Sequence, residues 1–317
     1  MTQSLNGSIP RRLRFVDSKL ALKLTCFPVE LTGTHSSNHN QTKAVAIIPA
    51  RFESTRLPGK ALLEIGGKPM ICRVAEQASA ARNVSRVIVA TDDQRIVSAV
   101  EAAGFEAVLT RAEHASGTDR LAEVAARIDA EIIVNVQGDE PLIAPETIEL
   151  AVTAINANAN AGIVTTWEPI EDFADVVNPD LVKIVIDSAG RAIYFSRAPV
   201  PWPRDAVLKH GTIENALLHQ PSLLKNFRKH TGLYVYRRDV LINYPLWPQS
   251  ALERQESLEQ LRALEHGVQI LAIEATTRSI GVDTAEDLER VRKIVSRSEF
   301  RDVARETQGM KLETAKP

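Results

Sequence analysis

The chain has 317 residues, of which 44% are hydrophobic and 25% are charged, which suits one large or two smaller globular domains with a sizeable core. Its net charge of -2 argues against a broad nucleic-acid-binding surface, and no apolar run is long enough to insert into a membrane. Two cysteines, Cys26 and Cys72, argue against a disulfide framework, so we expect a reducing, cytoplasmic compartment.

Residues 1–43 differ in composition from the rest. Arg11, Arg12 and Arg14 precede a mixed segment, and polar side chains crowd residues 32–42. We interpret residues 1–43 as an N-terminal extension, either a disordered tail or the product of a start codon assigned too far upstream. The basic, acid-poor beginning also weakly resembles a transit peptide. Residues 298–317 are expected to form a C-terminal tail, which leaves 44–297 as the folded domain.

Buried strands alternate with amphipathic helices through the first half of the chain. Strands are predicted at residues 44–48, 86–90, 107–109 and 132–136. A helix is expected after each strand, and the first, which Pro69 opens, shows Ile71, Val74 and Ala78 at helical spacing. This alternation predicts an α/β, Rossmann-like fold with a mostly parallel sheet flanked by helices.

The second half has a different pattern. A β-hairpin is predicted over residues 182–195, an aromatic strand over 230–236, a helix over 257–265 and a last strand over 268–274. Residues 206–229 are polar and have no clear period. Asp283 and Glu286 predict a capping box at the start of a final helix. We expect a smaller hairpin subregion within about residues 180–260.

Three polar loops follow predicted strands, at residues 49–60, 111–118 and 137–141. The carboxyl ends of parallel strands meet at one edge of a sheet, where ligands bind. We therefore expect these three loops to form one site.

The first loop carries three cations, Arg51, Arg56 and Lys60, and Gly59 lets the backbone approach a ligand closely. Arginine forks and a lysine ammonium suit phosphate oxygens, which we favour over a solvated basic loop. The loop has neither the Walker A pattern nor the G-x-G-x-x-G pattern, which disfavours P-loop hydrolysis and hydride transfer.

Several polar residues have a structural as well as a functional interpretation. Asp139 and Asp283 could hold Mg²⁺, but Asp139 is equally a turn residue, and spacing alone favours a helix cap for Asp283. Ser116 and Gly117 form either a helix start or a base-reading loop. Other such side chains are Glu253, Glu256 and Gln260, which share one face if the stretch is helical throughout, and His230, which alone is more often structural.

The ordered segments together resemble the nucleotide-sugar cytidylyltransferases, and most closely the 3-deoxy-D-manno-octulosonate (KDO) cytidylyltransferase family. The resemblance runs from about Ala44 to Val295. It rests on IIPARFESTRLPGK, IGGKPMI, VIVATDD, TRAEHASGTDRLAE, IVNVQGDEP, YFSRAPVPWPRD, KHTGLYVYR, LERQESLEQLRAL and GVDTAEDLERVR. The segment QGDEP, where CMP-sialate synthetases carry a Gln-Pro-Thr-Ser-type sequence, favours the octulosonate.

The resemblance implies that residues 44–297 transfer CMP from CTP to KDO for lipopolysaccharide biosynthesis, with Mg²⁺ as cofactor and a homodimer as the assembly. It implies catalytic roles for Arg51, Arg56 and Lys60 and metal-binding roles for Asp139 and Asp283. The implied nucleotide-binding residues are Pro49, Ala50, Arg111, Ser116, Gly117 and Gln137. The implied sugar-binding residues are Arg197, His230, Tyr234, Glu256 and Gln260, with Gln137 also at the sugar.

Two regions depart from the family pattern, residues 1–43 and the longer or more divergent stretch 206–229, where lid or dimer contacts could differ. Activation of another sugar acid, such as an amino-substituted octulosonate or a sialate-like acid, is one alternative function. A catalytically silent nucleotide-binding regulator is another, although the presence of all five charged site residues argues against it.

Overall fold

The computed structural model describes residues 43–54, 56–114, 116–278 and 280–297. The predicted extension, apart from Lys43, and the predicted tail lie outside these residues, so the domain limits 44 and 297 remain predictions. Within the described residues, no helix is long and apolar enough to cross a membrane.

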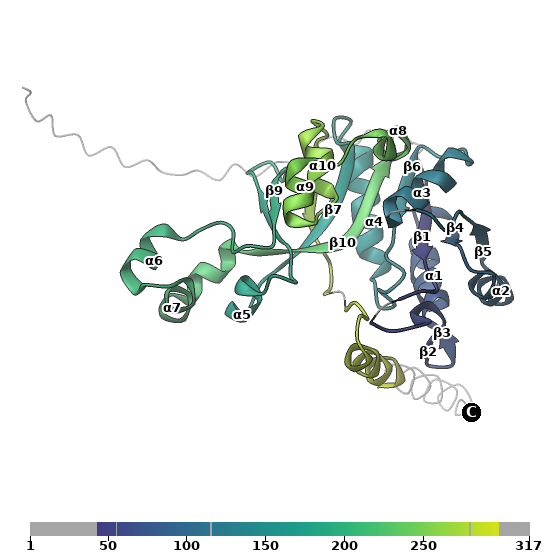
Figure 1. Ribbon diagram of the computed structural model, residues 1–317, viewed down its shortest axis with the longest axis horizontal. Coiled ribbons are helices and arrows are strands. Elements are labelled where there is room, and N and C mark those ends of the chain that lie inside the picture. The colour runs from purple at the N-terminus through teal and green to yellow at the C-terminus, as the bar shows by residue number, and fades with distance from the viewer. Residues whose placement is uncertain (1–42, 55, 115, 279, 298–317) are drawn as a thin grey trace, which may run out of the picture. The chain divides into compact units, whose positions relative to one another are not determined.

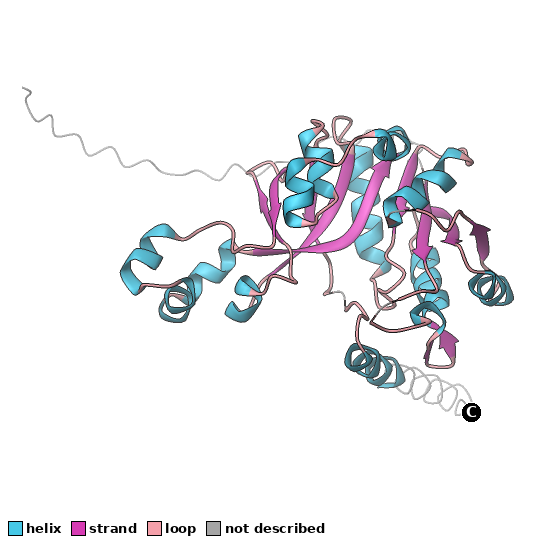
Figure 2. Ribbon diagram, viewed as in Figure 1, coloured by secondary structure: helices cyan, strands magenta, loops and turns pink. Residues whose placement is uncertain are grey.

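A mostly parallel sheet forms the centre of the described domain (Figures 1 and 2). Its strand order is β11-β7-β10-β6-β1-β4-β5, in which β10 runs antiparallel to both neighbours and every other neighbouring pair is parallel. The strands are β1 (Ala44–Ala50), β4 (Val84–Thr91), β5 (Glu106–Leu109), β6 (Ile132–Asn135), β7 (Ile163–Pro169), β10 (Arg228–Arg237) and β11 (Ile270–Glu274).

Helices cover both faces of this sheet, as predicted. Strand β1 is buried on both sides, since Ala46 and Ile48 enter one hydrophobic cluster whereas Val45 and Ile47 enter another. The first cluster includes residues of α1 (Met70–Ala80), α2 (Gln94–Ala102) and α4 (Pro145–Ala157). The second includes residues of α3 (Gly117–Ala126), α8 (Arg238–Asn243) and α10 (Gln260–Glu265). The α/β fold class is thereby confirmed.

Strand β7 has no counterpart among the predicted strands, although it lies between β10 and β11. It carries two threonines, Thr165 and Thr166, that hide its apolar pattern in the sequence. Both are fully buried, and the Thr165 hydroxyl donates to the Leu233 carbonyl at 2.8 Å. A neighbouring strand therefore supplies the polar partner that makes burial of a threonine possible.

The predicted helix over 257–265 is wrong in its beginning. The chain forms α9 (Ala251–Glu256) and α10, separated at Ser257, which has a left-handed φ of 54°. A left-handed residue ends a right-handed helix, so Glu253, Glu256 and Gln260 do not share one helical face. Glu253 instead forms a buried pair with Arg262, whose Nε lies 2.7 Å from the carboxylate.

The predicted hairpin is confirmed as β8 (Lys183–Ile186) and β9 (Ala192–Ser196), and β8 also pairs with β10. The unassigned stretch 206–229 lies largely in short helices. Ile213, Leu217 and Phe227 from this stretch pack with Ile170 and Val176 in a separate small core. The elements concerned are α5 (Phe173–Val177), α6 (Arg204–His210), α7 (Ile213–His219) and the 3-10 helix η2 (Pro221–Asn226). Each of these elements is only five to seven residues long, which is too short to show a helical hydrophobic period in the sequence.

Candidate active site

The site begins where the strand order reverses. From β1 the chain proceeds to β4 and β5 on one side, whereas β6 pairs with the other side of β1. The loops that leave β1 and β6 meet there, because a Cβ atom on Gly138 would lie 2.6 Å from the Pro49 carbonyl oxygen. Glycine is therefore required at position 138, and Pro49 lies between Gly138 and Gly117, whose Cβ would lie 3.6 Å from Pro49 Cγ. Ala50, the last residue of β1, is buried beside it in the chain. This is the crevice where open α/β sheets bind ligands.

The loop after β1 folds back on itself between Phe52 and Gly59, immediately before Lys60. The Gly59 amide donates to the Phe52 carbonyl at 3.2 Å, and Gly59 has a left-handed φ of 67°. Lys60 then starts the 3-10 helix η1 (Lys60–Leu62). A small hairpin, β2 (Glu64–Ile65) and β3 (Lys68–Pro69), connects η1 to helix α1.

Charges from three distant parts of the sequence meet around Lys60. Its ammonium lies 2.7 Å from Asp139 Oδ2 and 3.1 Å from Asp283 Oδ1, and Arg56 lies 3.0 Å from the same Asp283 oxygen. The Lys60 side chain is 16% exposed, against 66% for Arg56. The Lys60 pairs are thus better shielded from solvent than the Arg56 pair, which contributes little to stability.

Asp283 reaches this cluster because it is not the helix cap. The predicted Asp283–Glu286 capping box is wrong: the Thr284 hydroxyl accepts from the Asp287 amide at 3.2 Å, and the Asp287 carboxylate accepts from the Thr284 amide at 2.9 Å. The following helix, residues 285–297, packs Leu288 and Val291 in a cluster with Ile65 and Met70 beside the first loop. Because the helix cap is Thr284 and not Asp283, the Asp283 carboxylate is left to pair with Lys60.

Asp139 and Asp283 are also connected through the backbone, because the Val282 amide donates to the Asp139 carbonyl at 2.9 Å. Their carboxylates meet at one ammonium, so a cation already occupies the place between them. Among the described residues, no group of three or more His, Cys, Asp and Glu side chains gathers for a metal ion. Two oxygen ligands fit Mg²⁺, which takes its remaining ligands from water and substrate phosphates.

The loop after β5 contacts the loop after β1. Arg51 Nη2 donates to the His114 carbonyl at 2.7 Å, and Ser116 caps helix α3 by accepting from the Asp119 amide at 3.2 Å. Ser116 and Gly117 thus form a helix start, and Gly117 also lines the cavity described next. Arg111 is 73% exposed and lies 3.6 Å from Glu123, so its guanidinium has freedom to move.

A cavity of about 470 Å³ joins this loop to the second half of the chain. It brings together five of the predicted site residues, namely Gly117, Gln137, Arg197, Tyr234 and Gln260. Two backbone carbonyls fix the Arg197 guanidinium: its Nε donates to the Glu256 carbonyl at 2.8 Å, and its Nη1 donates to the Pro179 carbonyl at 3.0 Å.

The structure distinguishes Glu259 from Glu256. Glu259, which was not singled out in the sequence, lines the cavity, and the hydroxyls of Ser116 and Thr118 bind its carboxylate. Burial raises its pKa above the usual value. The predicted sugar ligand Glu256 is not among the residues that line this cavity. Its carboxylate accepts from Ser196 Oγ at 2.7 Å and from the Arg197 amide at 2.9 Å. The break in the helix at Ser257 lies between the two residues, so that Glu259 lines the cavity and Glu256 does not.

His230 and Tyr234 form a half-buried aromatic pair with ring centroids 5.3 Å apart. Burial lowers the pKa of His230 to about 3, so the imidazole is neutral, and its Nε2 lies 2.9 Å from the Thr165 hydroxyl. Burial raises the pKa of Tyr234 well above its usual value, so the phenol keeps its proton. His230 therefore supports Tyr234, which lines the cavity.

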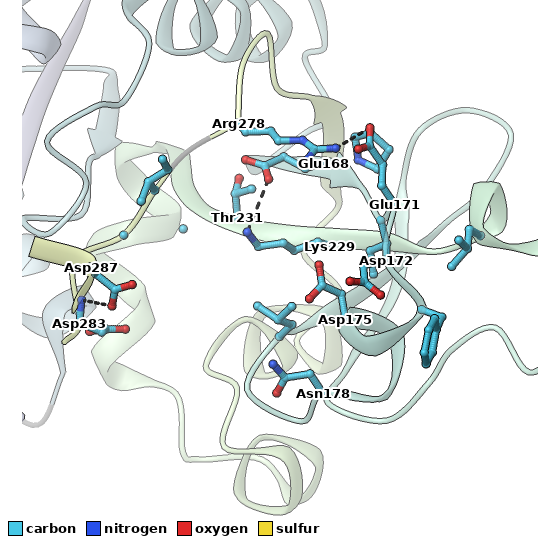
Figure 3. Close-up of a pocket in the computed structure, with 18 of the residues that line it drawn as sticks. Glu168, Glu171, Asp172, Asp175, Asn178, Lys229, Thr231, Arg278, Asp283 and Asp287 are labelled. Atoms are coloured by element: carbon cyan, nitrogen blue, oxygen red, sulfur yellow. Dashed lines mark hydrogen bonds and ion pairs between the residues drawn. The ribbon is translucent and has the colours of Figure 1, made fainter. Parts of the chain in front are cut away.

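A larger cavity, of about 990 Å³, is lined by Thr231 and Gly232 among others, and Figure 3 shows its charged residues. Asp283 and Asp287 are on its wall, as are Glu168 and Lys229, which pair at 3.5 Å. Its lining has seven carboxylates against three cations, which makes it unfavourable for a triphosphate. The cations that suit phosphate, Arg51, Arg56 and Lys60, are not among the residues that line it.

Comparison with known proteins gives concordant results. A family profile described as cytidylyltransferase matches residues 45–270. The chain is similar to the 3-deoxy-manno-octulosonate cytidylyltransferase of Geobacter sulfurreducens, with 51% identity over 246 residues that cover 78% of this chain and 96% of the relative. It is 50% identical to the protein of the same name from Syntrophotalea carbinolica, with the same coverage.

A solved structure of CMP:2-keto-3-deoxy-manno-octonic acid synthetase complexed with CTP is similar throughout its length. It aligns with a TM-score of 0.73 and 42% identity, covering 81% of this chain and 100% of that chain. The likeness therefore extends from the sequence to the arrangement of the sheet and its helices.

Proposed function

This chain belongs to the family of 3-deoxy-manno-octulosonate cytidylyltransferases, and on that premise we propose that it transfers CMP from CTP to the anomeric hydroxyl of KDO. The hydroxyl oxygen forms a bond to the α-phosphorus, the bond to the β-phosphate oxygen breaks, and pyrophosphate leaves. The single observation that carries the proposal is the meeting of Lys60, Asp139 and Asp283, since Asp139 follows by two residues Gln137, which lines the 470 Å³ cavity.

The charged cluster suits a triphosphate that arrives with its own cation. Arg56 and Lys60 are paired with Asp139 and Asp283 in the chain alone. In our proposal these cations, with Arg51, turn to the phosphate oxygens and stabilise the departing pyrophosphate. The cation that accompanies the triphosphate would then pair with the carboxylates that Arg56 and Lys60 leave, so no charge is left without a partner.

We propose that Asp139 and Asp283 hold Mg²⁺, which when bound supplies charge stabilisation and lowers the pKa of a bound hydroxyl. The protein's own part is to keep these two carboxylates beside the triphosphate. The hydrogen bond from the Val282 amide to the Asp139 carbonyl supports that role, because it fixes two segments that are far apart in sequence.

The sugar acid is proposed to occupy the 470 Å³ cavity. The Arg197 guanidinium suits the KDO carboxylate, because a planar fork binds two oxygens at once. Gln260, Tyr234 and Glu259 line the same cavity and suit sugar hydroxyls. Gln137 lines this cavity two residues before Asp139 in the sequence, and its Nε2 donates to the Gly232 carbonyl at 3.2 Å. Cytosine is proposed to contact Pro49, Ala50, Arg111, Ser116 and Gly117.

We propose a homodimer in the cytoplasm as the working form. Exposed apolar side chains around the small helical core support a protein contact there, with Trp202 56% exposed, Leu208 69% and Leu218 55%. Cys72, a buried free cysteine, is compatible with a reducing compartment.

The proposed function is tested by release of pyrophosphate from purified protein supplied with CTP, Mg²⁺ and KDO. A panel that adds an amino-substituted octulosonate and a sialic acid, compared by kcat/KM, tests the identity of the sugar. We expect KDO to give the highest value. Absence of pyrophosphate with every sugar acid, under conditions where a known synthetase is active, would contradict the proposal.

A further inference from the structure

Glu123 is a largely enclosed carboxylate on helix α3 that does not line either cavity described above. Its side chain is 9% exposed. Oxygen Oε2 accepts from the Arg111 backbone amide at 3.2 Å and contacts His114 Nε2, whereas Oε1 contacts the guanidinium of Arg127. One carboxylate thus binds both the backbone and a side chain of the loop after β5.

His114 extends this connection to the loop after β1. Its imidazole is 6% exposed, so it is held inside the protein rather than free at the surface. Its backbone carbonyl accepts from Arg51 Nη2 at 2.7 Å. A continuous path therefore runs from Glu123 on α3 through His114 to Arg51.

These contacts differ from an ordinary surface ion pair. Burial opposes ionisation of Glu123, but the hydrogen bonds from His114 and the Arg111 amide and the charge of Arg127 lower its pKa overall. The carboxylate is therefore charged at neutral pH. Hydrogen bonds to a buried charge are stronger than those between neutral groups, and removal of one partner leaves the other unsatisfied.

We propose that Glu123 is a positioning residue for CTP, which fixes the loop around Arg111 and His114 and, through the His114 carbonyl, the direction of Arg51. The inference rests on the proposed function, in which that loop contacts cytosine and Arg51 contacts the triphosphate. Glu123 itself touches neither substrate. Its loss should impair the use of CTP and leave the sugar-acid cavity intact, because the described contacts of Glu123 are with that loop and Arg127.

The test measures KM separately for CTP and for KDO in Glu123→Ala and Glu123→Gln. We expect the alanine variant to raise KM for CTP by roughly tenfold or more, since a hydrogen bond to a charged group is worth about that factor. KM for KDO should stay within about twofold. Glutamine keeps one carbonyl acceptor of similar shape, so its KM for CTP should rise by a smaller factor, on the order of threefold to fivefold.

Arg127→Ala is the matched control. Arg127 is 55% exposed and touches Glu123 from the solvent side, so its loss should leave both KM values within about twofold of the wild type. His114→Ala should reproduce the effect of Glu123→Ala. In the double variant, the factor by which KM for CTP rises should be much smaller than the product of the two single-variant factors, because both substitutions break the same connection.

Three results separate the possible failures. If the wild type releases no pyrophosphate, the proposed function fails. If the wild type is active and Glu123→Gln and Glu123→Ala leave KM for CTP unchanged, the positioning role alone is wrong. An equal rise in KM for both substrates also overturns it, because a loss of general structure would act on both. The glutamine variant keeps this test available if the alanine variant does not fold.

Discussion

The site has two sides that are built in opposite ways. The ionic side, Lys60 with Arg56, Asp139 and Asp283, consists of partly exposed charges on loops that pair with one another. The proposed sugar side, which is the 470 Å³ cavity around Tyr234 together with His230, consists of largely enclosed groups whose pKa values burial shifts towards the neutral form. On the proposed function, the ionic side would exchange charge partners with its ligand, whereas the sugar side would bind by a preformed shape.

The largest effect is expected on the ionic side. Asp139→Asn keeps the size of the side chain but removes its charge, and we expect the rate of pyrophosphate release to fall by roughly 1,000-fold. Electrostatic stabilisation by a metal ion is worth several kcal/mol, and about 1.4 kcal/mol corresponds to a factor of ten. The measurement is turnover with CTP, Mg²⁺ and KDO at saturating KDO.

Asp129→Asn is the matched control for this experiment. Asp129 is exposed and precedes β6, at the opposite edge of the sheet from Asp139. It should leave turnover unchanged. Normal turnover in Asp139→Asn would exclude the proposed metal-binding role of Asp139.

A smaller effect is expected on the sugar side, where two neighbouring glutamates can be compared. Glu259→Gln should lower kcat/KM for KDO by about 10-fold to 100-fold, because it changes a cavity group that would bind a hydroxyl. Glu256→Gln should instead lower the free energy of unfolding by about 1–3 kcal/mol, since its carboxylate accepts from Ser196 and Arg197.

Kinetics with varied KDO and thermal unfolding of both variants make the distinction. The opposite pattern, in which Glu256→Gln alone impairs use of KDO, would restore Glu256 as the sugar ligand and would show that Glu259 has a supporting role.

The smallest effect concerns the pH dependence of stability. Burial lowers the pKa of His230 to about 3 from the ordinary value of 6.5. Below pH 6.5 the unfolded chain binds a proton that the folded chain does not, so folding stability falls as the pH falls towards 3. Between pH 6.5 and pH 5 this single group should cost about 1.5 kcal/mol.

Urea unfolding at these two pH values measures the effect. His230→Gln should lose less stability than the wild type over the same interval, because glutamine does not titrate. An identical loss in both proteins would mean that His230 has the same pKa in the folded and unfolded chain, so that burial does not keep its imidazole neutral.

The sequence by itself determined the parallel first half and the three loops, because buried β1, β4 and β6 have long apolar runs and polar residues follow them directly. It also determined that Arg56, Lys60 and Asp139 belong to loops at one edge of the sheet. Those features depend on local pattern and on the rule that parallel strands place their carboxyl ends together.

Only the tertiary structure decided the rest, because the deciding contacts join residues that are far apart in sequence. Strand β7 carries threonines whose burial requires partners on β10. Asp283 faces Lys60, 223 positions away in sequence, because Thr284 takes the cap position. The left-handed Ser257 turns Glu259 rather than Glu256 into the cavity. Each outcome depends on one residue's backbone or hydrogen bonds, which hydrophobic periodicity does not record.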